Sequence, residues 1–268
     1  MKLKMLLSTA VATAAFTAVL PASATPIFPV FTVNPGALSG TISPFTANDL
    51  GGQYFEKVTF TTATLFNVSL YFQGGQFTLD DTTAPVIYNA AQSGLASKYG
   101  LYATFLGSGN YAPASGGGTT FNLTSGNLSL LLDPLNNTAI GTLPANGSTP
   151  FSPTNTADDI LLGTGINATG TGTSLGITCT NNNCGSFGQT TPFALTAAGS
   201  GFFVSPVPFF NLALTSGQFQ GINPVAGTTV TSTGTANTVF KVPEPSPLAL
   251  VGLGLLALGF SRRRSTKA

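Results

Sequence analysis

Apolar and polar residues alternate with a period of two in many stretches between residues 25 and 240. Residues 65–72 show this most clearly, because Phe66, Val68 and Leu70 fall on one side of an extended chain. Threonine, valine and phenylalanine, which are frequent in these stretches, suit the half-buried surface of a pleated sheet. The pattern predicts strands at 55–61, 65–72, 75–79, 99–106, 201–204, 208–214 and 228–240, and two more within 119–133 that join near Ser125 and Gly126.

Clusters of glycine, asparagine and proline separate the predicted strands at short intervals. This spacing is typical of an all-β, antiparallel body that is sandwich-like or barrel-like, with long loops. We expect loops at 107–118 and 143–156, and a short helical turn around Asn89. The second loop could divide the body into two sheets or subdomains, but one β-rich domain over residues 25–240 is the simpler interpretation.

Residues 1–24 have the pattern of a secretory signal peptide. Two lysines precede an apolar stretch, and Ala22 and Ala24 satisfy the small-x-small rule for cleavage. We therefore expect export through the Sec machinery and cleavage after Ala24. The alternative is a signal helix that is not cleaved and remains as an anchor.

An apolar stretch at 247–260 precedes a basic tail at 261–268. As a helix it would span about 21 Å, which is short against a hydrocarbon core of roughly 30 Å. It therefore predicts a short transmembrane helix that holds the chain in the inner membrane only transiently. Arg262, Arg263 and Arg264 would remain on the cytoplasmic side, where basic flanking residues accumulate. The alternative is a chance tail anchor behind a proline-rich linker.

Val242, Pro243, Glu244 and Pro245 form a compact motif ahead of the apolar stretch. Each proline fixes φ and lacks an N–H, so the motif is expected to stay extended and to present Glu244 to an enzyme. The motif, the apolar stretch and the arginines together resemble the PEP-CTERM sorting domain over residues 241–268. This resemblance implies a Gram-negative bacterium that makes exopolysaccharide, and a tail that the membrane transpeptidase exosortase recognises and removes.

The sequence contains two cysteines, Cys179 and Cys184. An exported chain meets an oxidising compartment, so we expect a structural disulfide. The asparagine-rich interval suits a tight loop at a hairpin tip. The alternatives are a metal site or a redox pair. A metal site would need further ligands although the sequence has no histidine, and redox cysteines usually have two residues between them.

Charged residues make up only 6% of the sequence. Between residues 25 and 241 there are three basic and seven acidic residues, a net charge of −4, and no basic stripe that would predict nucleic-acid binding.

The absence of histidine removes the usual catalytic triads and histidine zinc sites, so we predict no catalytic residue and no enzyme. Paired carboxylates could still support glycoside hydrolysis or bind calcium. The acidic candidates are Glu56, Asp80, Asp81, Asp133, Asp158 and Asp159.

These observations predict an exported protein that is not an enzyme and that stays at the cell surface or in the extracellular matrix. Neutral, hydroxyl-rich β surfaces can associate with exopolysaccharide and with each other without strong charge repulsion. Residues 31–36 and 44–49 are also similar to PEP-CTERM proteins associated with bacterial flocculation. We therefore expect a structural or adhesive role in aggregation, flocculation or biofilm. The alternatives are a carbohydrate-binding module and, third, a polysaccharide hydrolase.

Overall fold

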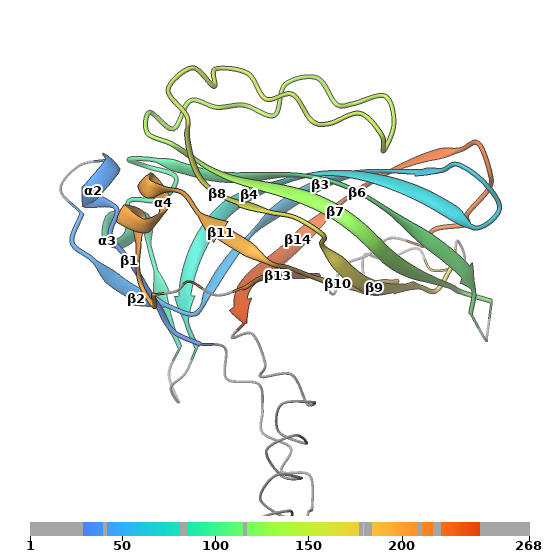
Figure 1. The fold of residues 1–268 in the computed structure, drawn as a ribbon, viewed down its shortest axis with the longest axis horizontal. Helices are drawn as coiled ribbons and strands as arrows, with labels where there is room; N and C mark the ends of the chain where they lie inside the picture. The colour runs from blue at the N-terminus through green and yellow to red at the C-terminus, as the bar shows by residue number, and fades with distance from the viewer. Residues whose placement is uncertain are drawn as a thin grey trace, which may run out of the picture.

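Eight strands form the main body of the molecule. They are β3 (Asp49–Phe60), β4 (Leu65–Leu79), β6 (Gly100–Pro113), β7 (Thr119–Asp133), β9 (Thr169–Ser174), β10 (Gly185–Thr191), β13 (Asn211–Ser216) and β14 (Thr229–Lys241). Each pairs antiparallel with its neighbours in the order β9, β10, β13, β14, β3, β4, β6 and β7, and β7 pairs with β9 to close a barrel (Figure 1). The predicted all-β, antiparallel body is confirmed, and its barrel-like form is the one observed.

The computed structural model describes residues 29–39, 42–80, 85–114, 117–176, 179, 184–207, 209, 211–216 and 221–241. The expected signal helix and the expected C-terminal transmembrane helix lie outside these residues. In the part of the chain that is described, no helix has the length and the apolar character needed to cross a membrane.

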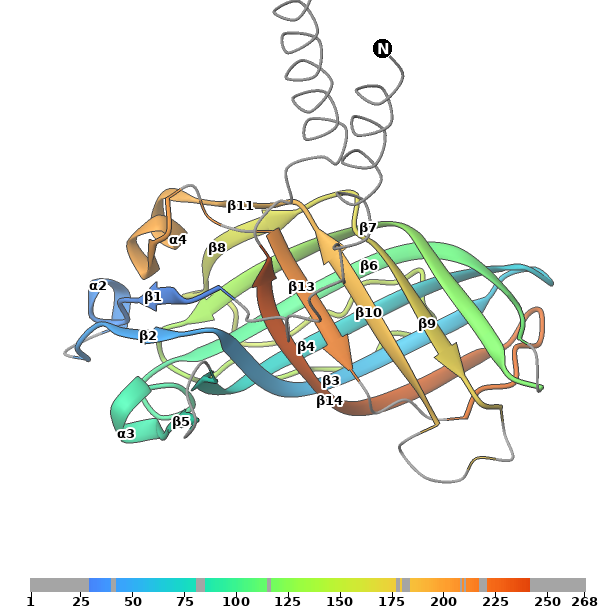
Figure 2. The ribbon, with the colours of Figure 1, turned by 90° about the horizontal axis from the view of Figure 1, so that it is seen from below.

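Short elements gather around one end of the barrel (Figure 2). β1 (Phe31–Val33), β2 (Phe45–Ala47) and β12 (Phe203–Ser205) form a small antiparallel sheet. The other short elements are α2 (Gly36–Ser39), β5 (Val86–Tyr88), α3 (Ala90–Ser93), β8 (Ile160–Gly165), β11 (Phe193–Leu195) and α4 (Ala197–Phe202). α3 coincides with the predicted helical turn, and Asn89 caps it by accepting from the backbone N–H groups of Ala91 and Gln92.

The barrel interior is the hydrophobic core. The alternating apolar residues of β4, including Phe66, Val68 and Leu70, are all buried there, as their spacing predicts. At the end near the short elements, phenylalanines pack edge to face, and the rings of Phe31 and Phe240 lie 4.7 Å apart. Such aromatic contacts fill the barrel end with apolar surface from several strands.

Several strand predictions need correction: residues 65–79 form one strand and not two, and residues 201–202 belong to α4, so that only the end of the strand predicted at 201–204 is extended. Residues 119–133 form one continuous strand, since Ser125 and Gly126 pair with Ser108 and Gly107 instead of turning the chain. For the same reason residues 107–113 belong to β6 and not to a loop. The alternation also missed β8, whose three apolar residues are consecutive, and β9 and β10, which are rich in glycine, threonine and serine and have few apolar residues to mark an inward face.

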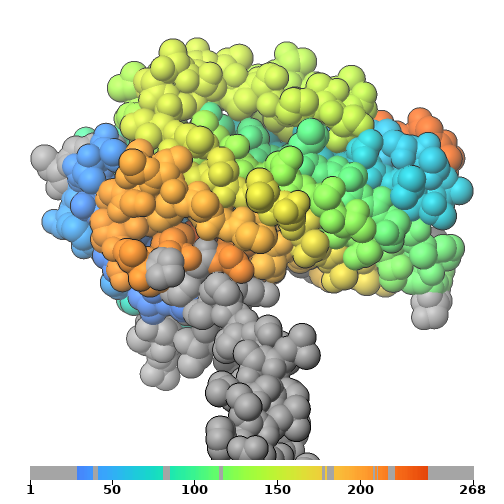
Figure 3. Space-filling view, in the orientation of Figure 1, coloured from blue at the N-terminus to red at the C-terminus, as the bar shows by residue number. Residues whose placement is uncertain are grey.

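The loop between β7 and β8, residues 134–159, runs back along the outside of the barrel (Figures 1 and 3). The predicted loop at 143–156 is confirmed, but it does not divide the body into two sheets. Its Phe151 covers the stacked rings of Tyr71 and Tyr102, which are 5.4 Å apart, and the three form a second buried cluster. Gly147 lies so close to β4 that an added Cβ would be 2.2 Å from the carbonyl oxygen of Asn67.

We expect Phe151→Ala to lower the free energy of unfolding by about 3 kcal/mol, because it removes a buried ring from this second cluster. Urea unfolding followed by circular dichroism measures the change. Leu135→Ala is the matched control, since Leu135 lies on the same loop and is 68% exposed. An equal effect of the two substitutions would show that the loop is not held by Phe151.

Candidate functional site

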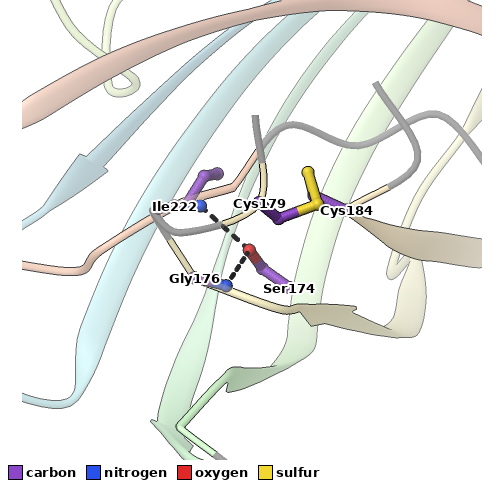
Figure 4. The surroundings of a disulfide bond; sticks show 5 residues. All are labelled: Ser174, Gly176, Cys179, Cys184 and Ile222. Carbon is purple, nitrogen blue, oxygen red and sulfur yellow. Dashed lines mark hydrogen bonds between the residues drawn. A yellow bond between two sulfur atoms is a disulfide. The ribbon is translucent and has the colours of Figure 1, made fainter. Parts of the chain in front are cut away.

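The two cysteines form a disulfide in the connection between β9 and β10, at the barrel end far from the short elements (Figure 4). Their Cα atoms are 5.6 Å apart, which confirms the predicted bond. Nearby, the Ser174 hydroxyl accepts hydrogen bonds from the backbone N–H groups of Ile222, at 2.9 Å, and Gly176, at 3.4 Å. These bonds tie the disulfide-bonded connection to the chain that enters β14.

A cleft of about 520 Å³ opens at the same barrel end. No carboxylate and no lysine lies among its described lining residues, so the described part of the cleft is neutral. The cleft is lined by Ala63, Tyr111, Pro113, Gly117, Gly118, Thr119, Leu175, Gly176, Ile222, Asn223, Pro224 and Ala226.

Two open grooves on the outer face of the barrel are also neutral. The first, which we call the amide groove, has a volume of about 370 Å³. The second, the threonine groove, has a volume of about 500 Å³. Amide and hydroxyl groups in their linings can both donate to and accept from sugar hydroxyls. The amide groove is lined by Asn67, Leu106, Gly107, Ser108, Ser125, Gly126, Asn127, Gly147, Ser148 and Asn167. The threonine groove is lined by Asn122, Thr169, Gly170, Thr171, Gly188, Gln189, Thr190 and Thr215.

The structure brings three of the acidic candidates together at the base of the long loop. One carboxylate oxygen from each of Asp133, Asp158 and Asp159 lies within 4.8 Å of the others. Asp133 accepts from two backbone N–H groups in the first turn of the loop, and Asp159 accepts from the hydroxyls of Thr138 and Tyr102. Asp158 Oδ2 is buried without a hydrogen-bond partner. An oxygen-only group suits a hard cation such as calcium, but two of its three members already hold the loop ends.

The remaining acidic candidates are dispersed. Asp80 is exposed directly after β4, as expected of a turn residue, and Asp81 lies outside the described residues. Glu56 is buried on β3 and is not among the three clustered acids. Asp158 and Asp159 directly precede β8.

The sorting motif follows β14, which ends at Lys241. The predicted cleavage residues Ala22 and Ala24, the motif Val242 to Pro245 and the basic residues Arg262 to Arg264 lie outside the described residues. Residues 241–264 match the family model of the PEP-CTERM protein-sorting motif. The chain carries a PEP-CTERM sorting motif. No curated protein and no solved structure matches the chain.

A PEP-CTERM motif implies exosortase-dependent sorting of a secreted protein that associates with the cell surface of a Gram-negative bacterium. The motif confirms the resemblance seen in the sequence. The match covers 24 residues and gives no information about the chemistry of the barrel.

One acidic side chain, Glu56, lies inside the barrel and is only 6% exposed. It projects inward from the middle of β3, where its cross-strand neighbours are Leu70 on β4 and Ser232 on β14. Burial in this apolar setting raises the pKa of Glu56 to about 7, because the charged form is poorly solvated there. The carboxyl is therefore largely protonated below neutral pH.

Two other groups of β3, Tyr54 and Asp49, also have a raised pKa. Burial, and then the charge of Glu56, raise the pKa of Tyr54, two residues earlier on the same face of β3. Burial also raises the pKa of Asp49 to about 6, although a hydrogen bond from Thr78 partly opposes it. The sequence offered one signal for Glu56 that the prediction did not use: it occupies the same side of the alternating stretch as the apolar Val58 and Phe60.

We expect the free energy of unfolding to fall as pH rises from about 4.5 to about 7. The folded barrel holds the Glu56 proton in that window and the unfolded chain does not, so stability is fully present below the ordinary pKa of 4.5 and is lost up to the folded pKa. Since one pKa unit corresponds to about 1.4 kcal/mol, the loss is about 3 kcal/mol. Urea unfolding at several pH values measures it.

Glu56→Gln should remove this part of the pH dependence, because the amide is neutral throughout. Asp49→Asn is the control: it should make the fall between about pH 4 and 6 smaller, because the Glu56 share remains there, and leave the fall between 6 and 7 unchanged. A Glu56→Gln barrel with the same pH profile as the unsubstituted protein would contradict the assignment.

Proposed function

We propose that this protein is processed by exosortase and then remains at the cell surface or in the exopolysaccharide matrix, where it has a structural or adhesive role and catalyses no reaction. Its partners in this proposal are exopolysaccharide and other copies of the same chain. The sorting motif supports the delivery route, and the chemistry of the barrel surface supports the role.

The neutral outer face of the barrel is the observation that carries the proposal. Hydroxyl groups pair across neighbouring strands there, as Thr59 and Thr229 do at 2.8 Å. One of the few charges on this face, the Lys57 ammonium, donates to the Thr231 hydroxyl at 2.7 Å. A surface of this kind offers many hydrogen bonds to polymer hydroxyls and little charge repulsion between copies.

A carbohydrate-binding module is the second candidate, and the amide groove favours it. Asn67, Asn127 and Asn167 come from three distant parts of the sequence and line one cleft. Calcium could assist such binding through the acids at the base of the loop. A paired-carboxylate hydrolase is the third candidate and has less support, since no carboxylate is among the described lining residues of the cleft and the two grooves.

Replacing Pro243, Glu244 and Pro245 by alanines should leave the protein at full length and attached to the membrane, because the processing enzyme loses its extended recognition segment. Immunoblots of membrane, surface and medium fractions measure size and location. Pro247→Ala, which lies just beyond the motif, is the matched control and should be processed normally. Unchanged size and release of the triple variant would contradict exosortase processing.

Deletion of the gene should reduce aggregation and biofilm, and the unsubstituted gene should restore both. A deletion strain with normal aggregation would contradict the adhesive role.

Processed protein recovered from the medium, tested on a glycan array in EDTA and in millimolar calcium, separates the first two candidates. Saturable binding to a defined glycan that Asn127→Asp and Asn167→Asp weaken would favour the carbohydrate-binding module, and a calcium requirement would place a cation in it.

A further inference from the structure

The Glu56 carboxyl lacks a protein partner for one of its oxygens. Oε2 is buried and makes no hydrogen bond within the described chain. Even when the carboxyl is neutral, an unsatisfied buried oxygen is unfavourable, and native proteins nearly always pair such groups with protein or with ordered water. A hydrogen-bond partner other than the described side chains is therefore expected at this oxygen.

A void lies next to this carboxyl, inside the barrel. Glu56, Tyr54 and Ser216 supply its polar lining, and four apolar side chains complete the wall. The two hydroxyls come from different strands, β3 and β13, so the polar groups converge from separate parts of the wall. The Ser216 hydroxyl donates to the carbonyl oxygen of Thr235 at 2.8 Å and can still accept from an occupant. The occupant therefore has up to three hydrogen-bonding neighbours, which is the number that a buried water usually has.

The size of the void limits what can occupy it. About 10 Å³ is open to the centre of a water molecule, which is close to the minimum that one water needs. A sugar, a lipid or a nucleotide does not fit. A metal ion is also disfavoured, since Glu56 is the one carboxylate among the described lining residues and burial alone accounts for its raised pKa.

We propose that this void is a binding site for one ordered water molecule, which hydrogen-bonds to Glu56 Oε2 and is held by the hydroxyls of Tyr54 and Ser216. The water donates to Oε2 when the carboxylate is charged, and it can equally accept when the proton resides on that oxygen. The site lets the barrel keep an acid in its core without an ion pair. This inference does not depend on the proposed role at the cell surface.

Oxygen-17 magnetic relaxation dispersion of the processed protein tests the proposal, because it counts waters that stay inside a protein for long times. We expect Glu56→Gln to retain the water, since the amide also offers polar atoms at that position. Glu56→Leu, which is similar in size and apolar, should show one long-lived water fewer than the unsubstituted protein. Equal counts in the unsubstituted protein and in Glu56→Leu would overturn the proposal.

Tyr54→Phe provides a second test if Glu56→Leu does not fold. It removes one hydroxyl from the void and leaves the ring in place, so the water should exchange faster while circular dichroism shows an intact barrel. A high-resolution crystal structure of the unsubstituted protein gives an independent answer. Density for one water within hydrogen-bond distance of Oε2 supports the site. An empty void, an ion in it, or a side chain bonded directly to Oε2 would refute it.

Discussion

The pairing of β7 with β9 is the interaction on which the rest of the structure depends. Residues 119–123 of β7 pair with residues 170–174 of β9 and turn a curved sheet into a closed ring. Closure leaves these strands without free edges and encloses every inward side chain. β9 can take this place because its glycines admit close neighbours: a Cβ on Gly170 would lie 2.3 Å from the carbonyl oxygen of Gly188.

Closure also separates two chemical environments. Inside, apolar residues from most of the barrel strands pack together, and Glu56 has its pKa raised because water is largely excluded. Outside, threonine, serine and asparagine face the solvent, and the long loop covers the tyrosines that would otherwise be exposed there. The result is a rigid body with a neutral, hydrogen-bonding exterior, which is a suitable component for a matrix of hydroxyl-rich polymers.

Some features were predictable because they are local. The alternation at residues 65–72 gave the inward face of β4, and the short interval between Cys179 and Cys184 gave the disulfide. Other features were not. Ser125 and Gly126 look like a turn in the sequence, yet they stay extended because partners on β6 are available to them. Asp133 joins Asp158 and Asp159 only because the loop between them folds back to its starting point.

By itself the sequence determined the sorting address, the disulfide and the inward or outward direction of the clearest strands, since each follows from neighbouring residues or from a period of two. The tertiary structure alone decided the closure of the barrel, the void beside Glu56 and the two neutral grooves. The physical reason is register: these features need strands far apart in the sequence to align at particular residues, and a shift of one residue would turn each side chain to the opposite face.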